Sequence, residues 1–104
     1  MIGSGSVPAQ DICDVDAIAA ATMACPAVAG LDEGGTRAVA TYLPGRRVVG
    51  IRVEDGRVLV SVVLALGFSV QTLEVQVRSA LAGHIRGRQV DVHVADVETA
   101  TDVS

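Results

Sequence analysis

The dipeptide Asp55-Gly56 constrains the fold of this chain more than any other feature, because it separates two valine-rich runs by only two residues. Asp-Gly is a preferred pair for the tight turn that joins neighbouring antiparallel strands. Before the turn, residues 47–54 alternate between apolar and other side chains, and after it residues 57–66 are almost continuously apolar. A continuous apolar strand is typical of a central position with both faces at least partly covered. We therefore predict a hairpin whose second strand lies in the middle of a sheet.

Before and after these strands along the chain, apolar residues recur at helical spacing and no longer at every second residue. The first predicted helix spans about residues 14–25, where Asp14 or Asp16 can accept hydrogen bonds from the free amides of the first turn. Residues 26–35 begin with proline and contain several glycines, so we expect a turn and a loop there. The second predicted helix spans about residues 70–85 and carries one apolar stripe.

Two further strands, about residues 36–43 and 89–97, complete the predicted order α-β-β-β-α-β. We expect an α+β two-layer sandwich, in which two helices cover one face of a mainly antiparallel four-stranded sheet. The right-handed crossover makes the last strand parallel to the strand before the second helix. A chain of 104 residues favours one domain, which we place at residues 14–97 between flexible tails at 1–13 and 98–104.

Composition excludes several classes of function. Half of the residues are hydrophobic but only 2% are aromatic, which argues against a platform that stacks single-stranded nucleic acid. The formal net charge of −4 gives no general attraction to nucleic acid or to anionic lipid. The uncharged runs 17–31 and 58–72 are shorter than the roughly 20 residues that span a bilayer as a helix. No basic segment of a secretory signal precedes an apolar run, so we expect a cytoplasmic protein without direct membrane insertion.

No catalytic, cofactor or metal motif is present in the sequence. Cys13 and Cys25 lie twelve residues apart without a CxxC spacing, and His84 and His93 are distant from them and from each other. The cysteines are expected to be free thiols or small buried side chains, with a disulfide as the alternative. No serine or cysteine stands in the context of an activated nucleophile. We therefore expect a protein that is not an enzyme and that uses no cofactor or metal.

Two features remain as candidate interaction surfaces. The arginines are expected at one end of the sheet, and a valine strip is expected on the sheet face that the helices leave uncovered, where it would support self-association. The candidate residues are Arg46, Arg47, Arg57, Val58, Val60 and Val62. The alternative interpretation is a small regulatory module that binds an anionic ligand or nucleic acid through Arg46, Arg47 and Arg57.

With these elements placed, the order and spacing of several segments resemble the alkaline shock protein family, small bacterial proteins of the envelope stress response. The segments are residues 53–58, 67–70, 73–85 and 87–94. Residues 40–50, together with the alanine-rich helix and residues 25–30 that follow it, look like the short actinobacterial branch. The resemblance covers about residues 17–97. It departs from the family at Asp91, where asparagine is common, and at Leu66, where an aromatic residue is frequent.

The resemblance implies a non-enzymatic protein of cell-envelope homeostasis. Members of the family self-associate and are recruited to the membrane by membrane-anchored partners. We therefore expect a homo-oligomer that reaches the inner face of the membrane through such a protein partner, with no nucleic-acid partner. The long charged tails of larger members are missing here. No catalytic residues are carried over.

Overall fold

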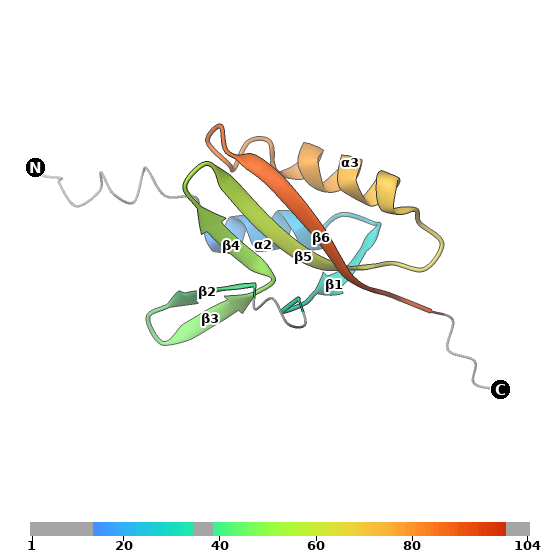
Figure 1. Cartoon of the computed structure of the whole chain (residues 1–104), viewed down its shortest axis with the longest axis horizontal. Coiled ribbons are helices and arrows are strands. Elements are labelled where there is room, and N and C mark those ends of the chain that lie inside the picture. Colours follow the sequence, from blue (N-terminus) through green and yellow to red (C-terminus); the bar gives the residue numbers. More distant parts are fainter. Residues whose placement is uncertain (1–13, 35–38, 100–104) are drawn as a thin grey trace, which may run out of the picture.

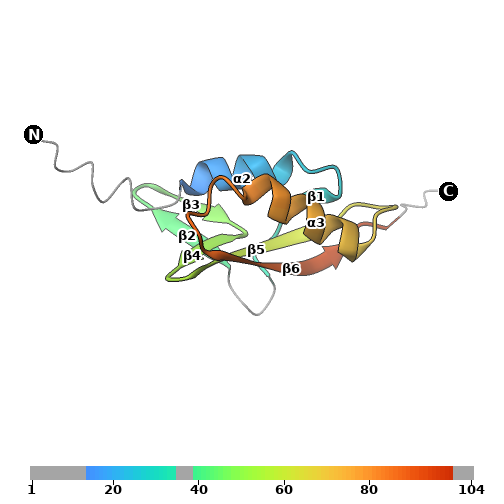
Figure 2. The same ribbon diagram turned by 90° about the horizontal axis from the view of Figure 1, so that it is seen from above.

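The computed structural model describes residues 14–34 and 39–99 and has the α+β architecture expected from the sequence (Figure 1). The elements in chain order are α2 (Val15–Met23), β1 (Val28–Leu31), β2 (Ala40–Leu43), β3 (Arg46–Val49), β4 (Ile51–Glu54), β5 (Arg57–Leu64), α3 (Val70–Leu81) and β6 (Gln89–Val97). Both helices lie on the same side of the main sheet (Figure 2). The predicted fold class, with two helices on one face of a mainly antiparallel four-stranded sheet, is confirmed.

Strand β5 is the centre of the main sheet. It pairs along its whole length with β6 in the parallel direction, as the crossover rule predicted. On its other side it pairs antiparallel with β4 over its first half and with β1 over its second half. Glu54 lies opposite Arg57 in the register, so the predicted hairpin at Asp55-Gly56 is confirmed. Strands β2 and β3 form a separate two-stranded sheet.

The predicted strand at residues 47–54 is divided at Gly50, which has a φ of +87°. Its N–H donates to the carbonyl of Val39 (2.8 Å), and its carbonyl accepts from the N–H of Ser61 (2.8 Å). Gly50 therefore bonds to the segment that enters the small sheet and also to the main sheet. Glycine adopts this left-handed backbone at little cost, so the chain can leave β3 and start β4 in a different sheet.

Strand β1 lies where we predicted a turn and loop. It is only four residues long, and its register with β5 shifts between Val28 and Gly30. A short segment that contains glycine and an irregular register gives almost no period-two signal. Strand β1 pairs with the part of β5 that extends beyond the end of β4. This pairing therefore depends on the arrangement of the whole sheet and not on the sequence of β1 alone.

The helix ends follow ordinary capping chemistry. Asp14 caps α2, because its side chain accepts hydrogen bonds from the N–H groups of Asp16 (3.0 Å) and Ala17 (3.2 Å). Ser69 caps α3 by accepting from the N–H of Thr72 (3.0 Å). Helix α3 ends at Leu81, four residues before the predicted end. Among the described residues, no helix is both long and apolar enough to cross a membrane.

The core lies between the helices and the inner face of the sheet. From the sheet it contains Val58, Val60, Val62 and Leu64 of β5, which contact buried side chains of both helices, among them Ile18, Leu73 and Val77. Val58, Val60 and Val62 are fully buried. Our expectation of these three valines on an uncovered surface is therefore wrong. The physical reason is the alternation of a strand: the side chains at even positions of β5 all face the helices.

Some predictions lie outside the described residues. These are the tail at residues 1–13 with Cys13, the first residues of the predicted strand at 36–43, and residues 100–104 of the second tail. Residues 98 and 99 are described and belong to no helix or strand.

Candidate interaction surfaces

Arg46 and Arg47 start strand β3 and are ion-paired within the chain. The Arg46 guanidinium donates to both carboxylate oxygens of Asp16 on α2, at 2.9 and 2.7 Å. This hydrogen bonding lowers the pKa of the Asp16 carboxyl below its ordinary value of 3.8. Arg47 lies 2.6 Å from a carboxylate oxygen of Glu33. These pairs connect the small sheet to α2 and to the segment after β1.

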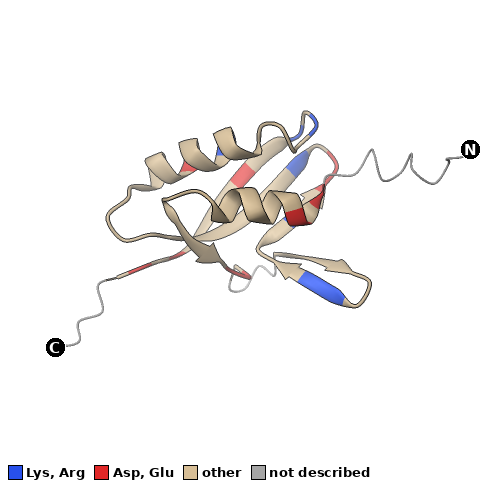
Figure 3. Ribbon diagram, turned by 180° about the vertical axis from the view of Figure 1, so that it is seen from behind, with Lys and Arg blue, Asp and Glu red and all other residues tan. Residues whose placement is uncertain are grey.

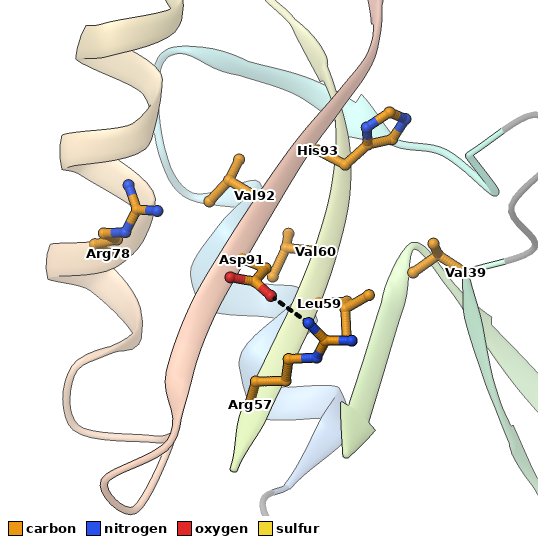
Figure 4. A pocket seen from close by; sticks show the side chains of 8 residues that line it. All are labelled: Val39, Arg57, Leu59, Val60, Arg78, Asp91, Val92 and His93. Carbon is orange, nitrogen blue, oxygen red and sulfur yellow. Dashed lines mark hydrogen bonds and ion pairs between the residues drawn. The ribbon is translucent and has the colours of Figure 1, made fainter. Parts of the chain in front are cut away.

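Arg57 belongs to a charge network on the outer face of the sheet, the face away from the helices. Its Nε lies 3.0 Å from Glu54 and its Nη1 lies 3.1 Å from Asp91, as Figure 4 shows for the second pair. Arg52 joins through Glu54 at 3.3 Å. The network contains two cations and two anions, so its formal charge is zero.

The three candidate arginines therefore do not form one unneutralised basic surface. The basic segment of β3 lies away from the other basic segments of the molecule in Figure 3. Each of Arg46, Arg47 and Arg57 has a carboxylate within 3.1 Å, which an anionic ligand would have to displace. Nothing in this arrangement favours the anionic-ligand alternative over the protein-contact interpretation.

The outer face of β5 is less apolar than we expected. It presents Leu59 and Val63, which are half-buried, and Ser61, which is fully buried. Val39 is also buried, at 4% exposure, and it lines an open pocket of about 380 Å³ on this face together with Leu59, Arg57, Asp91 and His93 among others (Figure 4). The Ser61 Oγ is buried and has no hydrogen-bond partner among the described residues.

The polar groups of this pocket suggest no reaction. Arg57 and Asp91 are occupied with each other, and the His93 ring points away from Asp91 (Figure 4). In the described part of the chain, no three side chains of histidine, cysteine, aspartate or glutamate are placed to hold a metal ion. Cys25 is a buried free thiol, and burial raises its pKa.

The outer edge of β6 was not identified from the sequence. The N–H of Gln89 donates to the carbonyl of Gly56 (2.9 Å), which fixes the parallel ladder between β6 and β5. In a parallel strand, every second residue directs both its N–H and its C=O to the same neighbouring strand. Gln89, Asp91 and His93 therefore bond to β5. The peptide groups of Val90, Val92 and Val94 consequently point to the open side. The Val90 carbonyl accepts from Arg78 of α3 at 3.2 Å.

Four exposed apolar residues lie on the chain segments around the end of the sheet where β5 and β6 finish. We call this surface the apolar end, and it consists of Leu66 (55% exposed), Phe68 (36%), Val70 (44%) and Val97 (50%). Val97 is in register with the last residue of β5, and the Leu66 N–H donates to the Glu98 side chain at 3.0 Å. These contacts bring the loop after β5 beside the end of β6.

A sequence signal for the apolar end exists in the loop at residues 65–69. Phe68 is the only phenylalanine of the chain, and it stands across Gly67 from Leu66, the last residue of the predicted strand. Large apolar residues beside a strand-breaking glycine have no core element to bury them. The β6 edge gave no such signal, because an edge strand and an inner strand can share one alternating pattern.

In the part of the chain that the structure describes, the fold and these surfaces define a small α+β protein with an open parallel edge strand, β6, and an exposed apolar end. No family model, curated protein or solved structure matches the chain.

Proposed function

We propose that this chain is a non-enzymatic protein of the envelope stress response, related to the alkaline shock proteins. It self-associates and contacts a membrane-anchored protein from the cytoplasmic side of the membrane. The cellular setting comes from the resemblance of residues 17–97. The observation that supports a contact function is the apolar end, because several exposed large apolar residues on segments around one end of a sheet are a feature of surfaces that bind partners.

The chemistry of the apolar end suggests the kind of segment it binds. Exposed carboxylates of Asp96 and Glu98 lie on the same stretch of chain as Val97. A partner segment with apolar side chains and neighbouring basic residues would complement both the apolar surface and its acidic border. Basic residues are common beside the cytoplasmic ends of membrane-spanning helices, so such a segment is compatible with a membrane-anchored partner.

The test compares two exposed apolar residues of α3 and the loop before it. Phe68→Ser changes the apolar end, whereas Val75→Ser changes a residue that is 62% exposed on the outer side of α3 and does not belong to that surface. Tagged full-length chains are produced in the native host, and the membrane and soluble fractions are quantified. We expect the wild type and Val75→Ser to be recovered with membranes and Phe68→Ser to be at least several-fold depleted there.

A photoreactive amino acid at position 68, compared with position 75, provides the second readout. A crosslinked membrane protein from position 68 alone would support the proposal. It is contradicted if the wild type is absent from the membrane fraction, or if both serine variants distribute like the wild type.

A further inference from the structure

We infer that a second copy of this chain binds along the open edge of β6 in the antiparallel direction, with Val92 on the two-fold axis. This inference specifies the self-association part of the proposed function. Strand β6 runs from Gln89 to Val97, and its pairing with β5 is regular up to the shift between Val62 and Val63. The stretch in regular register with β5 is residues 89–94, and Val92 lies within it.

The backbone of β6 is prepared for such pairing. The peptide groups of Val92 and Val94 point away from β5, and neither has a backbone partner on that side among residues 14–34 and 39–99. In the proposed register, Val92 exchanges both hydrogen bonds with Val92 of the second copy, and Val90 pairs in the same way with Val94. The Val90 carbonyl already accepts from Arg78, but a carbonyl oxygen has a second lone pair.

The side chains of β6 complement themselves in this register. Asp91 lies directly opposite His93 of the second copy, and by symmetry His93 lies opposite the second Asp91. Both residues are exposed on the outer face, and Asp91 keeps its ion pair with Arg57 at 3.1 Å because a carboxylate accepts several hydrogen bonds, so the contact buries no unpaired charge. The valines at positions 90, 92 and 94 face the helix side in both copies and extend the apolar layer across the axis.

Other symmetric registers lack this complementarity. A shift that centres the pairing on Asp91 places two carboxylates opposite each other, and like charges directly opposite destabilise a strand pair. A shift that centres it on His93 places two histidines opposite each other and brings Asp96, beyond the register shift, opposite Val90. A register shifted by one residue from the proposed one would place a side chain that faces the helices opposite a side chain that faces outward. The pleat does not allow this, because directly opposite residues of two paired strands lie on the same face.

The closed symmetry limits the assembly to two copies. Each β6 edge is used once, and the resulting sheet is continuous through both chains with all helices on one side. A two-fold contact of this kind is isologous, because the same residues meet in both copies.

The experiment uses full-length chains and measures mass by light scattering and sedimentation over a range of concentrations. His93→Asp places two carboxylates opposite each other in both symmetric contacts, so we expect a dimer dissociation constant at least roughly tenfold higher than that of the wild type. Gln89→Asp is the matched control. It adds the same formal charge to an exposed residue of the same strand and face, but its opposite residue is Ala95, so we expect little change.

Mixing two weakened variants tests the register itself. Asp91→Lys weakens its own dimer, because it replaces the carboxylate opposite His93 with an ammonium group. When His93→Asp chains are mixed with Asp91→Lys chains, the introduced carboxylate meets the introduced ammonium group in one contact, and the original pair of Asp91 and His93 is kept in the other. We therefore expect mixed dimers that form more tightly than either variant alone, which also shows that both variants fold.

The results separate this inference from the proposed function. A wild-type dimer that His93→Asp weakens no more than Gln89→Asp does, or variants that do not form mixed dimers, would overturn pairing through β6. Self-association through another surface and the Phe68 test would then be unaffected. A wild type that stays monomeric at every concentration overturns the β6 pairing and the self-association part of the proposed function together.

Discussion

At the scale of single residues, Gly50 shows how one position directs the path of the chain. A Cβ atom at this position would lie 2.9 Å from the Leu31 Cβ and 2.9 Å from the Ser61 carbonyl oxygen, distances at which the backbone must shift. The positive φ adds a second requirement for glycine. The neighbouring sequence shows only a glycine in an alternating strand, since both atoms that exclude a side chain come from segments distant along the chain.

We expect Gly50→Ala to lower the free energy of unfolding by about 2–4 kcal/mol, from overpacking together with backbone strain. Gly45→Ala is the control, because Gly45 has a similar φ of +80° but nothing within 4 Å of the added Cβ. That variant should lose only the strain, about 1 kcal/mol. Urea unfolding of both variants measures the difference. Equal losses would show that the close approach at Gly50 has no energetic consequence.

The pair of Asp16 and Arg46 predicts a titration at the residue scale. The carboxyl pKa of Asp16 is lowered in the folded state, so the pair stabilises the fold above pH about 4, and this contribution is lost as the pH falls through the lowered pKa. NMR titration should place the Asp16 midpoint below 3.8. In Arg46→Gln the midpoint should return toward that value. An unchanged midpoint in the variant would show that Arg46 does not cause the shift.

At the scale of elements, β5 explains what sequence patterns could and could not predict. Its central position and its hairpin with β4 followed from a local turn and a continuous apolar run. The face that the helices cover did not follow, because both faces of such a run are apolar. The structure places Val58, Val60 and Val62 against the helices, while Leu59 and Val63 lie on the outer face.

Shortening one valine on each face of β5 tests this assignment. Val60 is fully buried in the core, so Val60→Ala should lower the free energy of unfolding by about 2 kcal/mol through lost apolar contact and a residual cavity. Val63 is half-buried on the outer face, and Val63→Ala should cost less than half as much. Thermal and urea unfolding provide the comparison. A larger loss for Val63→Ala would reverse the assignment of the faces.

At the scale of the whole molecule, the surplus of apolar residues is distributed differently from our expectation. The helices bury one face of β5, and the other face retains only Leu59 and Val63 as half-buried apolar side chains of that strand. Exposed apolar side chains lie instead at the end of the sheet, and the outward peptide groups of Val92 and Val94 in β6 have no backbone partner within the described ranges. Both features depend on which strand is at the edge and which loop meets which strand end. The neighbouring sequence does not determine either arrangement.

Hydrogen exchange of the backbone amides of β6 tests how the molecule uses this edge. The amides of Asp91 and His93 bond to β5 within one chain, so their exchange should be slow and independent of protein concentration. The amides of Val92 and Val94 point to the open side, so they should exchange rapidly in dilute protein. At a total concentration ten times the dimer dissociation constant, mass action leaves about one fifth of the chains monomeric, and exchange at these two amides should be about fivefold slower. Rates at Val92 and Val94 that do not change with concentration, in a protein that dimerises, would place the dimer contact on a different surface.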